Sequence, residues 1–143
     1  MRRIQIKFPV KCRLSHTCHN YESGSPMIND IDQIKLDDRI ILITGAGDGI
    51  GKAVALDCAK RGATVILLGK TVHKLEQVYD EIVATGGAEP AIYPMDLSGA
   101  AADDYDNLRD NIEKEFGHID ALFNNAGWLG ASTPMDIFDT ELW

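Results

Sequence analysis

The most constraining feature of the chain is an uncharged apolar run that opens into a glycine-rich loop. Residues 40–44 are mostly β-branched and predict a strand buried on both faces. Four glycines follow within seven residues, before a helical pattern begins: Gly45, Gly47, Gly49 and Gly51. A strand, a glycine loop and a helix in this order present backbone N–H groups and a positive helix end to a phosphate.

The glycine spacing excludes two common phosphate-binding patterns. In G-x-G-x-x-G the third glycine would fall on Ile50 or Lys52, and the Walker pattern fails because Ala53 replaces its Ser or Thr. The spacing that fits is T-G-x-x-x-G-x-G, from Thr44 to Gly51. Each glycine then serves a tight turn, a close approach to a phosphate or close helix–strand packing.

A second signature supports the first. Residues 124–127 read N-N-A-G and follow another apolar run, residues 119–123. With the glycine pattern, this resembles the short-chain dehydrogenase/reductase family, and the stretch from Leu36 to Gly51 is most similar to YciK-type bacterial oxidoreductases. The resemblance extends from Leu36 to Trp143, about three quarters of the chain.

Strand and helix patterns alternate after residue 38, which predicts a parallel sheet with right-handed crossovers. Strands are expected at residues 39–44, 64–68, 91–95 and 119–123. The fold class is α/β, a Rossmann-type sheet with strand order 3-2-1-4 that forms the first half of a doubly wound fold. Two helices are expected to bury one stripe each, made of Ile50, Val54, Ala55 and Cys58 in the first and of Tyr105, Leu108, Ile112 and Phe116 in the third.

Residues 1–35 are interpreted as a disordered N-terminal extension, and residues 36–143 as an NAD(P)-binding domain truncated on its C-terminal side. A transit peptide and a true start at Met27 are alternatives for the extension. No metal site is predicted, because four ligands crowded into eight residues do not match zinc spacing: Cys12, His16, Cys18 and His19.

Composition narrows the partners and the compartment. Hydrophobic residues make up 45% and charged residues 25% of the chain, as in ordinary globular domains. No apolar stretch approaches the length of a membrane span. The net charge is −8, and residues 1–20 carry five basic residues without an acid, so the acidic remainder is a poor nucleic-acid binder. The three cysteines are an odd number, and their spacing suggests no disulfide framework. They therefore favour a reducing, cytoplasmic compartment.

Lys70 decides between the two nicotinamide cofactors that the resemblance implies. NAD-binding folds place an acid after the second strand, to bond the ribose 2′-OH. Here Lys70 follows Gly69, and the next acid is Glu76. NADP is therefore predicted over NAD, with an ordinary surface lysine as the alternative.

The resemblance also implies a set of cofactor-binding residues. The pyrophosphate would lie along Gly45, Gly47, Asp48, Gly49, Ile50 and Gly51. Lys70 would meet the 2′-phosphate, Asp96 and Leu97 the adenine, and Asn125, Ala126 and Gly127 the ribose side. Residues 128–135 would border the substrate. Asp48 is unexpected in an anion-binding loop, and its side chain either points outward or caps the following helix.

No catalytic residue can be assigned. The family's reaction passes hydride between nicotinamide and a carbonyl or alcohol substrate and uses a Ser and a Tyr-x-x-x-Lys pair. The residues four beyond the tyrosines are Ser25, Val83, Leu97 and Arg109, so no such pair exists here. The chain alone is expected to be inactive, and the full-length enzyme to be a homo-oligomer. A non-catalytic NADP-binding module and an inert truncated fragment are the alternatives.

Overall fold

Strands and helices alternate along the part of the chain that the computed structural model describes, residues 34–127. The strands are β1 (Ile40–Thr44), β2 (Thr64–Gly69), β3 (Ala91–Pro94) and β4 (Ala121–Phe123). The helices are α1 (Gly49–Lys60), α2 (Val72–Ala84) and α3 (Ala102–Phe116). Each strand lies within two residues of its predicted bounds, and the extension, apart from its last two residues, lies outside the described residues.

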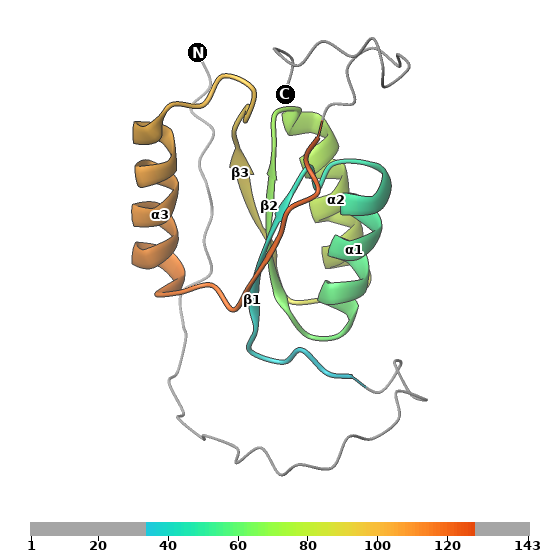
Figure 1. Cartoon of the computed structure of the whole chain (residues 1–143). Coiled ribbons are helices and arrows are strands. Elements are labelled where there is room, and N and C mark those ends of the chain that lie inside the picture. The colour runs from blue at the N-terminus through green and yellow to red at the C-terminus, as the bar shows by residue number, and fades with distance from the viewer. Residues whose placement is uncertain (1–33, 128–143) are drawn as a thin grey trace, which may run out of the picture.

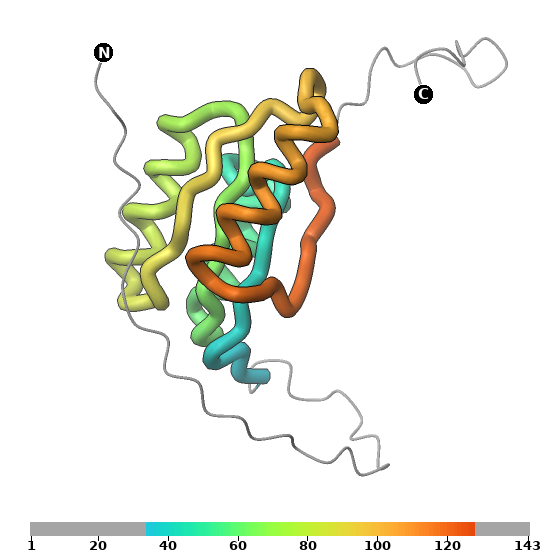
Figure 2. The backbone as a smooth tube through the Cα atoms, turned by 90° about the vertical axis from the view of Figure 1, so that its left-hand side faces the viewer, coloured from blue at the N-terminus to red at the C-terminus, as the bar shows by residue number. Residues whose placement is uncertain are grey.

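The four strands form one parallel sheet in the order β3-β2-β1-β4, which confirms the predicted order and fold class. Leu42 of β1 lies between Ile66 of β2 and Leu122 of β4. Helices α1 and α2 cover one face of the sheet and α3 covers the other (Figure 1). In the perpendicular view α3 crosses in front of the strands (Figure 2).

The side chains on the two faces of β1 and β2 belong to two separate hydrophobic cores. Ile43 and Leu67 pack against α1 and α2, whereas Leu42 and Ile66 pack against Leu108 of α3 and its neighbours. All five residues of β1 are buried, as predicted. The double burial explains why these strands read as continuous apolar runs, since neither face meets water.

Two residues expected in the helix cores are exposed. Ile50 keeps 69% of its surface and Tyr105 keeps 48%. Both stand near the N-terminal ends of their helices. Cys58 is half-buried against the α1–α2 core, and burial raises the pKa of its thiol, which agrees with its predicted packing role.

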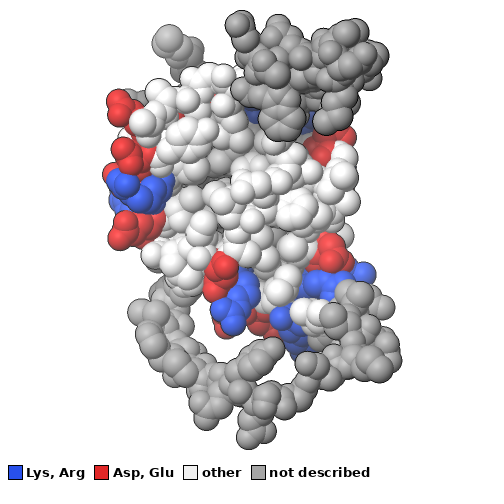
Figure 3. Space-filling model, viewed as in Figure 1, with Lys and Arg blue, Asp and Glu red and all other residues white. Residues whose placement is uncertain are grey.

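Strand β4 differs from the others in its exposure. All three of its residues are exposed, with Leu122 at 50% and Phe123 at 36%. Within the described residues β4 has a neighbour, β1, on one side only. Uncharged side chains spread over the middle of this side of the molecule, and charged ones gather at its margins (Figure 3).

Candidate functional site

A cavity of about 450 Å³ opens where the carboxyl ends of all four strands meet. Open α/β sheets bind their ligands at this edge. Seven of the predicted site residues line it: Gly45, Lys70, Asp96, Leu97, Asn125, Ala126 and Gly127. The other five predicted residues, 47–51, belong to the neighbouring loop and the start of α1. Residues 128–135, expected beside the substrate, lie outside the described residues.

The glycine loop is shaped by two glycines that no other residue can replace without movement. Gly45 has φ 64°, in the left-handed region that side chains disfavour. Gly51 is buried in the first turn of α1, and a Cβ there would collide with the carbonyl of Gly45 and would lie 2.6 Å from Asn125 Nδ2. The loop is thereby folded tightly onto the helix, with the N-terminus of α1 at the site.

Thr44 joins this loop to the segment after β4. Its Oγ accepts hydrogen bonds from the backbone N–H groups of Asn125 and Ala126, both at 2.9 Å. Asn125 Nδ2 donates in return to the carbonyls of Thr44 and Gly45, at 3.2 and 3.3 Å. Sequence reasoning assigned Asn125 and Ala126 to the cofactor and gave Thr44 no role. The available signal was a polar residue at the end of one apolar run, residues 40–44, and another directly after the second, residues 119–123.

Asp48 caps α1 and also forms an ion pair. It is the N-cap residue, and its Oδ1 accepts from Gly49 N at 2.8 Å. Its Oδ2 lies 2.6 Å from Nζ of Lys74 in the first turn of α2. The Lys74 ammonium and the Gly49 N–H lower the pKa of the Asp48 carboxyl. Of the two alternatives from the sequence, the capping role is therefore correct, and Lys74 is a neighbour that the sequence did not reveal.

Lys70 and Asp96 lie in the wall of the cavity. Lys70 is exposed at the end of β2, and the first turn of α2 beyond it contains no acid. Asp96 accepts from the N–H and the hydroxyl of Ser98, at 3.0 and 2.7 Å. These two bonds, with a weaker contribution from the Lys70 charge, lower the pKa of the Asp96 carboxyl. The cavity thus offers a cation and a fixed carboxylate on adjacent strand ends.

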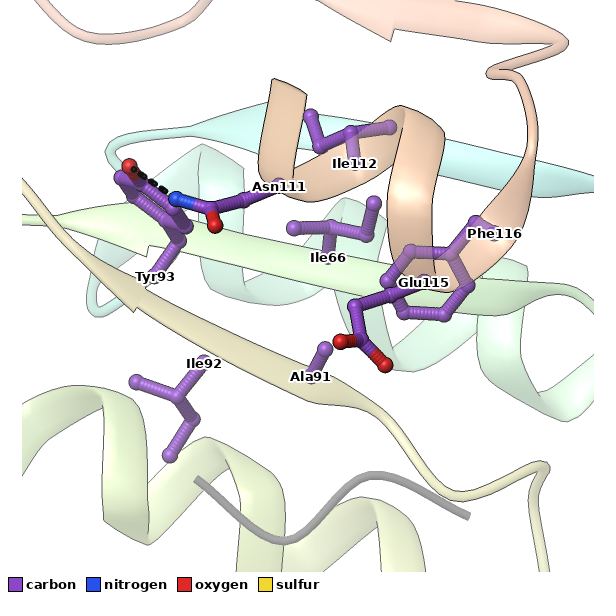
Figure 4. A pocket seen from close by; sticks show the side chains of 8 residues that line it. All are labelled: Ile66, Ala91, Ile92, Tyr93, Asn111, Ile112, Glu115 and Phe116. Carbon is purple, nitrogen blue, oxygen red and sulfur yellow. Dashed lines mark hydrogen bonds between the residues drawn. The ribbon is translucent and has the colours of Figure 1, made fainter. Parts of the chain in front are cut away.

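A second cavity, of about 80 Å³, lies between β3 and α3 (Figure 4). Its walls are mostly apolar, and its polar groups include Glu115 and the hydrogen bond from Asn111 Nδ2 to the Tyr93 hydroxyl, 3.3 Å long. It lacks a cation for a phosphate. Between residues 34 and 127, no three potential metal ligands cluster, and no helix is long and apolar enough to cross a membrane.

Comparison with known proteins finds a family model and oxidoreductases that match this chain. Residues 39–143 match the family model of the short chain dehydrogenases. The uncharacterized oxidoreductase YciK of Escherichia coli is 40% identical over 108 residues, which are 76% of this chain and 43% of that protein. A 3beta-hydroxysteroid dehydrogenase of Mediterraneibacter gnavus is 34% identical over 76% of this chain and 38% of its own length. The chain thus spans less than half the length of these relatives.

Solved structures give the same result. A short chain dehydrogenase of Shigella flexneri, crystallised with NADP, is 40% identical with a TM-score of 0.70, over 76% of this chain and 45% of its own. One from Escherichia coli CFT073, crystallised with NADPH, is 42% identical with a TM-score of 0.70, over the same shares.

Proposed function

The chain belongs to the short-chain dehydrogenase family, and we propose that it is the cofactor-binding part of an NADP-dependent oxidoreductase. The enzyme would transfer hydride between nicotinamide and a carbonyl or alcohol substrate. The bound cofactor would supply or accept that hydride. The observation that carries the proposal is the cavity across the strand ends, with Lys70 in its wall and no acid in the first turn of α2.

The loop fits a pyrophosphate in shape and charge. Gly45, Gly47 and Gly49 have no side chain to shield the backbone, and the N-terminus of α1 supplies unpaired N–H groups. Asp48 would contribute through its main chain, because its carboxylate caps α1 by accepting from Gly49 N. Ile50, 69% exposed beside these groups, would cover the cofactor with its apolar side chain.

The remaining predicted residues would each contact a different part of the adenosine half of the cofactor. Asp96 and Leu97 would hold the adenine, since they follow β3 at the far side of the cavity. Asn125, Ala126 and Gly127 would line the ribose side. Asn125 has a second role in this proposal, because its amide also fixes the loop through Thr44 and Gly45.

The proton-transfer step needs a group that these 143 residues do not contain, because no Tyr is followed four residues later by Lys. We therefore assign no catalytic residue and expect no turnover from this chain alone. A non-catalytic NADP-binding module is the second candidate, and it is favoured by the same absence. The domain from residue 36 onward, the cytoplasmic location and a homo-oligomeric full-length enzyme remain predictions.

Lys70 provides the test of the cofactor. Substituting Lys70→Ala should weaken NADPH binding by about 1–3 kcal/mol, the range for a charge-assisted hydrogen bond, and should leave NADH binding unchanged. Titration calorimetry of the 143-residue chain with both cofactors measures the difference. Lys60→Ala, which removes an exposed lysine in the last turn of α1, is the matched control. An equal loss for both cofactors, or a parent chain that prefers NADH, would contradict the proposal.

A further inference from the structure

The ion pair between Asp48 and Lys74 connects the glycine loop to the first turn of α2. The two side chains are 74% and 42% exposed, so the pair is formed in water. An exposed pair of this kind contributes little to stability, because water screens both charges, and it exchanges readily for a stronger partner. The pair also stands where a phosphate-binding loop meets the helix that follows Lys70.

The backbone of Lys74 is fixed against this loop by close packing. A Cβ placed on Gly47 would lie 3.0 Å from Cβ of Lys74 and 3.5 Å from Cδ2 of Leu75. The same Leu75 atom would lie 3.3 Å from a Cβ on Gly69, the residue before Lys70. Leu75 thus packs against both glycines, and Lys74, its neighbour in the first turn of α2, follows Lys70 by four residues at this junction.

Resting on the proposed NADP-dependent function, we infer that Lys74 is a second specificity-determining residue, which leaves Asp48 to bind the cofactor's 2′-phosphate together with Lys70. A phosphate monoester carries about 1.5 to 2 negative charges at pH 7. It therefore attracts an ammonium more strongly than one carboxylate does. Asp48 keeps its hydrogen bond from Gly49 N, so the cap on α1 survives the exchange.

In the free protein Asp48 binds the Lys74 ammonium, so Asp48 competes with the 2′-phosphate for that ammonium. The alternative is that Lys74 only neutralises Asp48. An unpaired Asp48 would then repel every phosphate at the loop, with or without a 2′-phosphate on the ribose. The two possibilities differ in selectivity, which is the quantity to measure.

The experiment uses two probes that differ only in the 2′-phosphate, adenosine 2′,5′-bisphosphate and AMP, in calorimetric titrations of the 143-residue chain. Lys74→Ala should lower the preference for the bisphosphate over AMP about tenfold, because the unpaired Asp48 weakens both probes alike and only the bisphosphate loses a contact with Lys74. Asp48→Asn, which keeps a capping side chain, should bind the bisphosphate about threefold more tightly. Lys60→Ala, which removes an exposed lysine at the opposite end of α1, is the control and should change neither affinity.

Lys74→Arg, which keeps the charge, should retain the selectivity, and thermal melting curves check that each variant is folded. Equal weakening of both probes by Lys74→Ala would overturn the inference and leave the proposed cofactor intact. A Lys74→Ala variant with parental affinity for both probes would do the same. A parent chain without preference for the bisphosphate over AMP would overturn the inference and the NADP assignment together.

Discussion

Ile50 and Gly51 are neighbours in the chain but have opposite environments. Ile50 is 69% exposed at the mouth of the site, whereas Gly51 is buried beneath the Gly45 carbonyl and the Asn125 amide. In the proposed complex the cofactor would cover the side chain of Ile50. The buried glycine allows the loop to fold onto the helix at that point.

Substituting Gly51→Ala should therefore distort the loop, because the neighbours of the new methyl group include backbone atoms, which cannot move aside cheaply. We expect a loss of about 1–3 kcal/mol in the free energy of unfolding, as for overpacked cores, and weaker NADPH binding. Urea unfolding and titration calorimetry measure both. Gly99→Ala is the control, since no atom lies within 4 Å of a Cβ there, and it should leave stability unchanged. Parental stability of the Gly51 variant would show that the loop adapts.

At the scale of elements, the short strand β4 is fastened to β1 at both of its ends. At the carboxyl end, Thr44 bonds to Asn125 and Ala126. At the amino end, Asp120 accepts from Ile40 N at 2.8 Å and from Arg39 Nη1 at 2.7 Å, and its side chain is only 17% exposed. Because β4 contributes only three residues to the sheet, these end contacts set its register and carry the segment after it into the site.

Asp120 gives this fastening a pH dependence. The Ile40 N–H, more than the Arg39 guanidinium and the His118 ring, lowers the pKa of the carboxyl below its ordinary value. A lowered native pKa means that the stabilisation is complete above the unfolded pKa of about 3.9, and is lost as pH falls through the native pKa.

Asp120→Asn should reduce the free energy of unfolding by about 1–2 kcal/mol at pH 7, because it removes a charge-assisted acceptor. The same substitution should flatten the loss of stability below pH 4. Urea unfolding from pH 3 to 7 measures both effects. The control is Asp103→Asn, which removes an exposed carboxylate from the first turn of α3. A variant whose stability follows the parent at every pH would show that Asp120 does not hold β4.

At the scale of the whole molecule, the β4 edge of the sheet, which has no partner strand within residues 34–127, governs the association that we expect. Exposed apolar side chains border that edge on β4 and on α3 with the turn after it: Tyr105, Ile119, Leu122 and Phe123. A strand edge with unpaired backbone groups and apolar neighbours is a site of association. At about 25 cal/mol per Å², covering a few hundred Å² is worth several kcal/mol, comparable with the stability of a domain.

We therefore expect the 143-residue chain to dimerise or aggregate through β4 when it is expressed alone. Light scattering across a concentration series measures its mass. Leu122→Lys should reduce the association, because a lysine on an edge strand opposes pairing. Val83→Lys, on α2 and 48% exposed, is the control and should leave the association unchanged. A parent chain that remains monomeric at all concentrations would contradict the expectation.

The sequence by itself was sufficient for the fold class, the strand order and the family. The strand order follows from the doubly wound topology that alternating strands and helices imply. The fold class and the family follow from short-range patterns: the doubly buried runs that became β1 and β2, the glycine spacing from Gly45 to Gly51, and the segment at residues 124–127. Such patterns reflect local geometry and burial, so they can be read from neighbouring residues. They also placed seven predicted residues around one cavity, because parallel strands end at a common edge.

Only the tertiary structure decided what the polar side chains contact. Thr44 meets Asn125 across 81 residues, and Asp48 meets Lys74 across 26. No local period encodes such pairs, because they depend on how strands and helices come together in space. The exposure of Ile50 was likewise not predicted, since helical spacing indicates which stripe of α1 faces the sheet but not which residues of that stripe are covered by other elements.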